Sequence, residues 1–425
     1  MYQAVFARDG GVQLPPCELD DFELVQPQQQ PTNIRWKLPL MYHEGNNGVM
    51  YIWQIAFDGG ELLRLHGSTT SARITKRKVV LNSTGRTLQE QALLEACNKY
   101  KNKYYAGYLP LDAKNPPQLK AMKGVPYQKG KVKKWPLLAS PKLNGIRMLV
   151  QNVGSASLRC LSYLNRSYEH LQHLYPSILG ILTYLPSQSV LDGELYRHGM
   201  SFHQICSAVK TTTHFHPQLQ AIQYHVFDLI CPENLPSESR AQLLQRAFNY
   251  WHQDICRDLQ ANTDNEVQQQ LQFQLQAVEL VPQQQVYNHE QVQQLKAFYQ
   301  GHGYEGLVLR TMALDSAVGS REYQSSLYRH GRSTKLYKVK DFIDEEGTVV
   351  GVVESMGNEE GTAGLRIRDI RGNIFTVRWG EHSEREKWLQ QPSLVEGKSF
   401  TFKYTELSQY GVPQQPTGVG FRDYE

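Results

Sequence analysis

A short polar turn, Ser140-Pro-Lys-Leu-Asn-Gly-Ile-Arg147, places two cationic side chains five residues apart. Lys142 and Arg147 follow the apolar run Pro-Leu-Leu-Ala, and Asn144-Gly145 is a strong turn signal. Like charges repel, so the fold must either hold them apart or give them an anion to share. A lysine amine attacks phosphorus only when neutral, a form that nearby cations and partial desolvation favour. The turn therefore predicts either a covalent nucleophile or an ordinary surface loop.

Four later segments also carry side chains with candidate chemistry: Asp192-Gly-Glu194, Tyr224-His-Val-Phe227, Glu305-Gly306 and Lys338-Val-Lys340. Each has an ordinary explanation when taken alone. An Asp-Gly or Glu-Gly pair also makes a hairpin turn, and a phenylalanine in an apolar run also suits a core strand. Alternate lysines also fit the outward face of a strand. The order of the segments is therefore more informative than any one of them.

Taken in order, these segments resemble motifs I, III, IIIa, IV and V of the covalent nucleotidyltransferase superfamily. That superfamily contains ATP-dependent DNA ligases, RNA ligases and mRNA capping enzymes. The segments Trp135–Arg147 and Glu305–Arg310 are similar to the DNA ligase form. The closing Pro-Thr-Gly-Val-Gly-Phe-Arg-Asp-Tyr-Glu is similar to the end of compact viral and phage-type ligases. The resemblance covers residues 135–425.

The resemblance implies a role for each matched residue. Lys142 would be the catalytic nucleophile that takes AMP from ATP and releases pyrophosphate. The nucleotide would be bound by Arg147, Glu194, Phe227, Lys338 and Lys340, with the phenylalanine stacked on adenine and the two lysines at the α-phosphate. Glu194 and Glu305 would hold Mg²⁺, or Mn²⁺ in its place, because hard cations prefer oxygen ligands. Further contacts to the nucleotide or the nick are expected from Asn144, Arg166 and Arg422.

Three positions depart from the family pattern. The family usually has aspartate where this chain has Asn144, and often an acidic reader of the adenine amino group where it has Ser140. Motif Ia commonly has an arginine directly after a serine. Here Tyr163 follows Ser162, and Arg166 lies three residues further on. The expected choice of ATP over other purine nucleotides therefore depends on the remaining motifs.

The composition limits the class of protein. The 425 residues are 40% hydrophobic and 20% charged, as in a soluble globular chain of several domains. The net charge of +4 is too small to indicate a nucleic-acid partner by itself. The six cysteines contain no C-x-x-C pair, which argues against an ordinary zinc site and fits a reducing compartment. Without a signal-like or membrane-spanning segment, we expect an intracellular, cytoplasmic monomer.

The element patterns predict an α+β multidomain fold in four parts. Residues 1–107 are predicted to form a small α+β module of strands and one helix, which loosely resembles a WGR-type DNA-binding module. Residues 108–134 read as a basic connector, and residues 135–342 as the adenylation (nucleotidyltransferase) domain. Residues 343–425 contain short strands separated by glycine-rich turns, which predict an OB-fold β-barrel.

Basic side chains outside the matched motifs predict contacts to DNA phosphates. In the first part they are Arg73, Lys76, Arg77, Lys78, Lys99, Lys101 and Lys103, and in the connector Lys131, Lys133 and Lys134. A solvated surface is the ordinary alternative for such runs of charge.

Together these patterns predict an ATP-dependent DNA ligase that seals 5′-phosphate/3′-hydroxyl nicks in duplex DNA through lysyl-AMP. Two alternatives stay open. An RNA ligase or an mRNA capping-type enzyme would use the same chemistry, although capping enzymes favour Asp-Gly where this chain has Glu305-Gly306. A non-catalytic nucleic-acid-binding protein could keep the fold, although it would have no need of Lys142 and its matched glutamates.

Overall fold

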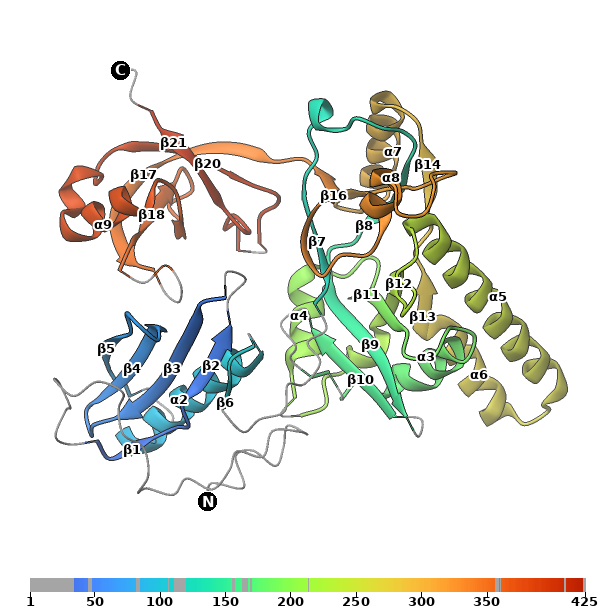
Figure 1. The fold of residues 1–425 in the computed structure, drawn as a ribbon, viewed down its shortest axis with the longest axis horizontal. Helices are drawn as coiled ribbons and strands as arrows, with labels where there is room; N and C mark the ends of the chain where they lie inside the picture. Colours follow the sequence, from blue (N-terminus) through green and yellow to red (C-terminus); the bar gives the residue numbers. More distant parts are fainter. Residues whose placement is uncertain are drawn as a thin grey trace.

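The computed structural model describes residues 34–422, apart from residues 45–47, 82–84, 106, 111–119, 155–156, 163–166, 169, 213, 356–358, 360 and 409. Arg166 therefore lies outside the described residues. The described strands form four sheets, and helices cover them in a mixed α+β arrangement (Figure 1), which confirms the predicted fold class. Within these residues, no helix combines the length and apolar character needed to cross a membrane.

The N-terminal sheet has the strand order β5-β4-β3-β2-β6, and β1 pairs with β3. Its strands are β1 (Trp36–Lys37), β2 (Met41–Glu44), β3 (Met50–Phe57), β4 (Glu61–Ser68), β5 (Arg73–Lys78) and β6 (Leu109–Pro110). Helix α2 (Leu88–Tyr105) covers one face, where Ala92, Ala96 and Tyr100 share a core with Trp53 and Phe57. The strands and the helix predicted in this region are therefore present.

The first sheet of the central region has the order β14-β8-β15-β16-β7. Its strands are β7 (Met122–Pro126), β8 (Leu137–Lys142), β14 (Gln284–Val286), β15 (Gly306–Thr311) and β16 (Gly331–Lys340). Helix α7 (His289–Gly301) adds Val292 to the core of this sheet, and α8 (Arg321–Ser326) precedes β16. Strand β7 comes from the segment expected to be a connector, and it pairs in parallel with β16.

The second central sheet has the order β10-β9-β11-β12-β13 and contributes to the largest core cluster. Its strands are β9 (Ile146–Gly154), β10 (Ser157–Ser162), β11 (Val190–Tyr196), β12 (Gln223–Ile230) and β13 (Val278–Leu280). The helices that accompany it are α3 (Tyr175–Leu182), α4 (Phe202–Lys210), α5 (Ser237–Ala261) and α6 (Asn265–Ala277). Short 3₁₀ helices occur at Lys129–Lys131, Gln172–Leu174, Leu219–Ala221 and Pro392–Leu394.

The C-terminal sheet has the order β19-β18-β17-β20-β21. Its elements are β17 (Ile343–Glu354), β18 (Ala363–Asp369), β19 (Ile374–Val377), α9 (His382–Gln390), β20 (Ser399–Tyr404) and β21 (Thr417–Phe421). Five strands with a helix between the third and the fourth have the connectivity of an OB-fold. Strands β19 and β21 are the two edges of the described sheet, so hydrogen bonding leaves this barrel open.

Candidate active site

The turn that carries Lys142 connects the two central sheets. Strand β8 ends at Lys142 in one sheet, and β9 begins at Ile146 in the other, so Lys142 and Arg147 belong to different sheets. A Cβ atom on Gly145 would lie 2.3 Å from the carbonyl oxygen of Leu195 and 2.8 Å from Cγ of Glu194. Glycine therefore allows the turn to pass close against β11. The fold therefore places the two cations in different sheets rather than along one strand.

Lys142, Glu305 and Lys340 meet because three neighbouring strands are in register at this level. Gly306 pairs with Lys142 on one side and with Lys340 on the other, and Glu305 directly precedes it. The Glu305 carboxylate forms ion pairs with Lys142 and, at 2.9 Å, with Lys340. All three side chains are 15–17% exposed. Burial opposes ionisation of Glu305, but Lys142 and Lys340 hold its pKa below the usual value.

Lys338 adds positive charge to this cluster. It lies two residues before Lys340 on β16, and alternate residues of a strand share a face. Partial desolvation lowers the pKa of Lys338, and the positive charges of Lys142 and Arg147 lower it further. Lys338 and Lys340, which were predicted to act together with Lys142, therefore belong to the same charged cluster.

Arg147 has a buried carboxylate of its own. Its Nε donates to Asp192 Oδ1 at 2.6 Å, and Tyr328 donates its hydroxyl to Asp192 Oδ2 at 2.7 Å. Asp192 is fully buried, and although burial opposes it, this carboxylate raises the pKa of Arg147. Neither Asp192 nor Tyr328 was among the predicted site residues. The Asp-Gly-Glu segment was a signal for Asp192, whereas nothing local marked Tyr328.

Glu194 faces Arg147 across the β9–β11 ladder. Burial raises the pKa of its carboxyl to about 7, against the opposing effects of Arg147 and Lys142. The negative charges of Asp192 and Glu305 also contribute to this increase. The carboxyl therefore keeps its proton to higher pH than an ordinary glutamate, and a bound cation would favour its ionised form.

Phe227 is placed by a β-bulge. Asp192 pairs with Asp228, but the next residue, Gly193, pairs with Val226, so Phe227 is the extra residue on β12. Bulges redirect a side chain relative to the regular ladder. The Arg147 guanidinium carbon lies 4.9 Å from the centre of the Phe227 ring, and that of Arg310 lies at 5.5 Å. The partly buried ring also packs against the core, so it borders both the core and the charged cluster.

A second buried ionic network was not anticipated from the sequence. Asp228 accepts hydrogen bonds from Arg240 Nε at 2.7 Å and from Arg310 Nε at 3.2 Å. Burial opposes ionisation, but Arg240 and Arg310 keep the pKa of Asp228 below its usual value. Arg310 also donates to the hydroxyl of buried Ser140 at 3.3 Å. The only sign of this network in the sequence was that Asp228 and Arg310 each lie within an otherwise largely apolar segment.

The remaining expected site residues are dispersed. Asn144 donates to Glu406 Oε1 at 2.8 Å in the segment between β20 and β21, whereas Arg422 forms an ion pair with Glu346 on β17. In the basic segment before β8, Lys131 and Lys133 are exposed, and Lys134 forms an ion pair with Glu322. Across the described ranges, no group of three or more His, Cys, Asp or Glu side chains could hold a metal ion by itself.

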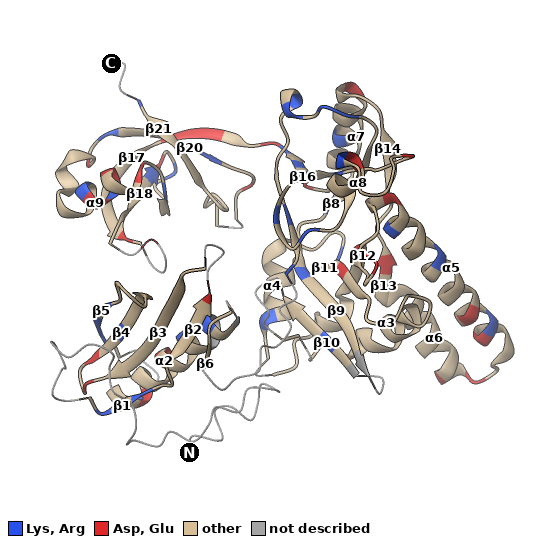
Figure 2. Cartoon of the chain, in the orientation of Figure 1, with Lys and Arg blue, Asp and Glu red and all other residues tan. Residues whose placement is uncertain are grey.

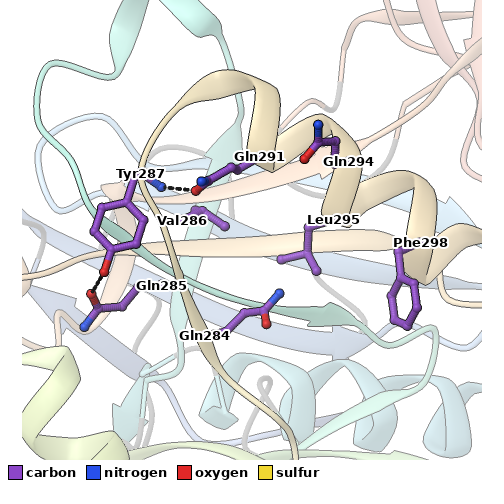
Figure 3. Close-up of a pocket in the computed structure, with 8 residues that line it drawn as sticks. All are labelled: Gln284, Gln285, Val286, Tyr287, Gln291, Gln294, Leu295 and Phe298. Atoms are coloured by element: carbon purple, nitrogen blue, oxygen red, sulfur yellow. Dashed lines mark hydrogen bonds between the residues drawn. The ribbon is translucent and has the colours of Figure 1, made fainter.

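A pocket of about 390 Å³ lies between the edge strand β14 and helix α7 (Figure 3). Its eight lining residues are Gln284, Gln285, Val286, Tyr287, Gln291, Gln294, Leu295 and Phe298. Tyr287 donates its hydroxyl to Gln285 Oε1 at 2.7 Å and its amide to Gln291 Oε1 at 2.8 Å. The lining has no charged group, so it offers no catalytic chemistry like that around Lys142.

Residues 117–340 match the family described as "ATP dependent DNA ligase domain", which is more than half of the chain. The chain belongs to this ligase family. The match includes Lys142, Arg147, Glu194, Glu305 and Lys340, and it extends upstream to include β7. We call residues 117–340 the ligase-domain segment.

Relatives and solved structures resemble the chain beyond the ligase-domain segment. A DNA ligase of African swine fever virus (isolate Tick/South Africa/Pretoriuskop Pr4/1996) is 24% identical over 294 residues, 66% of this chain and 62% of the relative. The isolate Warthog/Namibia/Wart80/1980 gives the same values. The chain thus spans less than two thirds of these relatives. The solved structure "Pmar-Lig_Pre." has a TM-score of 0.54 at 17% identity, covers 78% of this chain and 72% of its own, and shows a shared fold.

Proposed function

We propose that this protein is an ATP-dependent DNA ligase that seals nicks between a 5′-phosphate and a 3′-hydroxyl. The observation that carries the proposal is the meeting of Lys142, Glu305 and Lys340 at the adjoining ends of three neighbouring strands, beside Arg147 and Glu194 of the second central sheet. This arrangement offers a potential nucleophile, cations for phosphates and carboxylates in one place. Membership of the ligase family and the likeness to viral DNA ligases support it.

The proposed chemistry proceeds by three displacements at phosphorus. Lys142 Nζ forms a bond to the α-phosphorus of ATP while the bond to pyrophosphate breaks, and the amine loses its proton. An oxygen of the 5′-phosphate at the nick then displaces lysine and receives AMP. Finally, the 3′-hydroxyl oxygen bonds to the 5′-phosphorus, AMP leaves, and the hydroxyl proton is released. One phosphodiester is formed for each ATP converted to AMP and pyrophosphate.

The structure suggests how the chain's own groups assist these steps. Glu305 pairs with Lys142 and Lys340 before substrate arrives, which holds both lysines in place. Phosphate oxygens would compete with Glu305 for these cations and leave the Lys142 amine free to react. Arg147, oriented by Asp192, would contact phosphate or ribose, and the exposed part of the Phe227 ring would stack on adenine. Lys338 adds charge at the α-phosphate.

Glu194 and Glu305 are the proposed ligands of Mg²⁺, which can be replaced by Mn²⁺. They fit because Mg²⁺ keeps several waters and needs only one or two protein carboxylates. The raised pKa of Glu194 also indicates a carboxyl whose ionised form requires additional positive charge. When bound, the metal would offset the charge of the leaving pyrophosphate.

The proposal also includes a division of the chain and a partner. Residues 1–107 would bind DNA, 108–134 would connect, 135–342 would carry the adenylation chemistry and 343–425 would form an OB-fold domain. The partner is nicked duplex DNA, bound inside the cell by a monomer, with Asn144 and Arg422 as further contacts. Since β7 pairs with β16, part of the connector would belong structurally to the adenylation domain.

Incubation with labelled nucleotides tests the proposal directly. We expect covalent labelling by ATP with Mg²⁺, little by GTP, none by NAD⁺, and transfer of the label to nicked DNA. Labelling followed by sealing of nicked RNA alone would favour an RNA ligase, and labelling by GTP would favour a capping-type enzyme. Binding of DNA without labelling by any nucleotide would reject an enzymatic function.

A further inference from the structure

Strand β5 presents its basic residues on two opposite faces of the N-terminal sheet. Arg73 is opposite His66, and Arg77 is opposite Leu62, whose side chain lies in the core under α2. Residues directly opposite in a ladder share a face, so Arg73 and Arg77 lie on the α2 side. Lys76 and Lys78 therefore point to the other side. Against the effect of burial, the backbone amides of Gly60 and Glu61 lower the pKa of Asp58, and the charge of Lys76 lowers it further.

A cationic corner forms where β4 and β5 meet α2. It consists of Arg64, Arg73 and Arg77 from the strands and Lys99 and Lys103 from the helix, with His66 beside them. Arg64 donates to Thr75 Oγ1 at 3.2 Å, which links its guanidinium to β5. Lys103 Nζ lies 4.2 Å from the centre of the Tyr108 ring. Neither Arg64 nor His66 was among the predicted DNA-binding residues, and the side chain of Lys101 is not described.

The positive charges of the cationic corner are only partly offset by carboxylates. Partial burial lowers the pKa of Arg64, Lys99 and Lys103, and repulsion from neighbouring arginines lowers each of them further. Two carboxylates act in the opposite direction, Glu95 on Lys99 and Glu354 on Arg64. The described cations of the corner lie close enough to repel one another, so an anion that enters it would gain attraction from several groups already held in place.

We propose that this cationic corner binds the phosphodiester backbone of duplex DNA, away from Lys142. The geometry favours a chain of phosphates over a single small anion, because Arg73 and Arg77 lie about 13 Å apart along an extended strand. Figure 2 shows Lys and Arg along β5, at the outer edge of the sheet. This assignment deepens the proposed function, since it takes nicked DNA as the ligand.

The main alternative is that β5 is basic only because it is an edge strand. Lysines and arginines on exposed edges prevent unwanted strand pairing, and this purpose requires no particular face. A general positive field would likewise attract DNA regardless of face. The proposal differs from both because it assigns the binding to Arg73 and Arg77 and excludes Lys76 and Lys78.

A matched pair of double variants separates these explanations. Arg73→Gln/Arg77→Gln and Lys76→Gln/Lys78→Gln each remove two charges from exposed positions of the same strand. Binding of the full-length variants to fluorescent nicked duplex DNA is measured over a salt series. We expect the arginine variant to bind on the order of tenfold more weakly and to reduce the salt slope by about 2. The lysine variant should keep the slope of the parent protein.

Three results would overturn the assignment. Equal losses in both variants would mean a general field, and unchanged binding in both would remove the corner from the DNA interface. Displacement of DNA from the parent by poly-glutamate as effectively as by unlabelled duplex would indicate a site for acidic protein segments instead. Self-adenylation with ATP is measured on the same preparations, because its absence in the parent protein would reject the proposed function without affecting the binding comparison.

The pH dependence of binding gives an independent readout from Lys103. Burial and then Arg64 lower the pKa of Lys103 to about 8, while its surroundings also include His66 and the rings of Trp53 and Tyr108. His66, whose pKa burial lowers to about 4, does not titrate in this range. Affinity for DNA should fall as pH rises from 7 to 9, and Lys103→Arg should reduce this fall. An identical fall in both proteins would exclude Lys103 from the contact.

Discussion

Two groups of cations in this molecule are compensated in different ways. Around Lys142, carboxylates are interleaved with the cations: Glu305 pairs with Lys142 and Lys340, and Asp192 pairs with Arg147. In the cationic corner of the N-terminal sheet, Glu95 acts on Lys99 and Glu354 on Arg64, while Arg73 and Arg77 lie exposed on the edge strand. The first group lies between two sheets of the ligase-domain segment, whereas the second lies at the edge of one sheet.

On the proposed function, this difference in charge pairing corresponds to two kinds of ligand. A site that must bind a nucleotide, react and release its products needs its cations held in position while it is empty, which internal carboxylates achieve. A surface for the DNA backbone instead meets a dense array of negative charge, so uncompensated cations favour association. Four substitutions around Lys142 test how far its cations depend on the neighbouring carboxylates and polar groups.

Replacement of Lys142 by alanine should have the largest effect, namely complete loss of self-adenylation. No other group in the cluster is expected to provide the amine, although Lys338 and Lys340 lie nearby. Transfer of label from ATP to protein is the measurement, with unchanged DNA affinity as the control for folding. An acid-labile AMP adduct that persists in Lys142→Ala would show that the nucleophile is a different residue.

Asp192→Asn should destabilise the fold by about 3 kcal/mol, because it leaves the Arg147 charge without its buried partner. Asp254→Asn is the matched control, since its ion pair with Arg257 on α5 is exposed. There we expect a change of about 0.5 kcal/mol or less. Denaturant unfolding compares the two variants. Equal losses would mean that burial of the Asp192 pair has no special importance.

Glu194→Gln should stabilise the ligand-free protein above pH 7 by about 1–3 kcal/mol. Burial raises the pKa of Glu194 to about 7 in the folded state, from a usual value of 4.5. Between these values the folded protein keeps a proton that the unfolded chain has lost, so its stability falls as pH rises. Below pH 4.5 both states are protonated, and the difference between variant and parent should disappear. A difference that does not change from pH 4 to 8 would contradict this origin.

Asn144→Asp should have the smallest effect. Aspartate would place a second carboxylate against Glu406, which now accepts a hydrogen bond from Asn144 at 2.8 Å. The pair is solvent-accessible, so we expect a coupling of about 0.5 kcal/mol. A double-mutant cycle with Glu406→Gln, read out as the self-adenylation rate, measures it. Additive effects of the two changes would show that this contact does not influence the reaction.

The sequence was most informative about elements whose residue pattern arises from interactions between near neighbours in the chain. Local patterns predicted strands and one helix in the N-terminal part and short strands separated by turns in the C-terminal part, and both sets are present. The resemblance to the ligase family came from the order of the motifs, and the mixed α+β class came from the element patterns; both are confirmed. The incorporation of β7 into a sheet was missed, since its parallel partner β16 is some two hundred residues away.

Only the tertiary structure decided which charges meet. Tyr328 reaches Asp192, and Arg240 with Arg310 surrounds Asp228, over separations that no local spacing encodes. Likewise, the basic residues of β5 were visible as a run, but their division between two faces depends on the register with β4 and on which face α2 covers. The hydrophobic periodicity and the turn-forming residues depend on near neighbours in the chain, so the sequence alone shows them. Charge pairing acts through space, so it is determined only when distant strands are packed together.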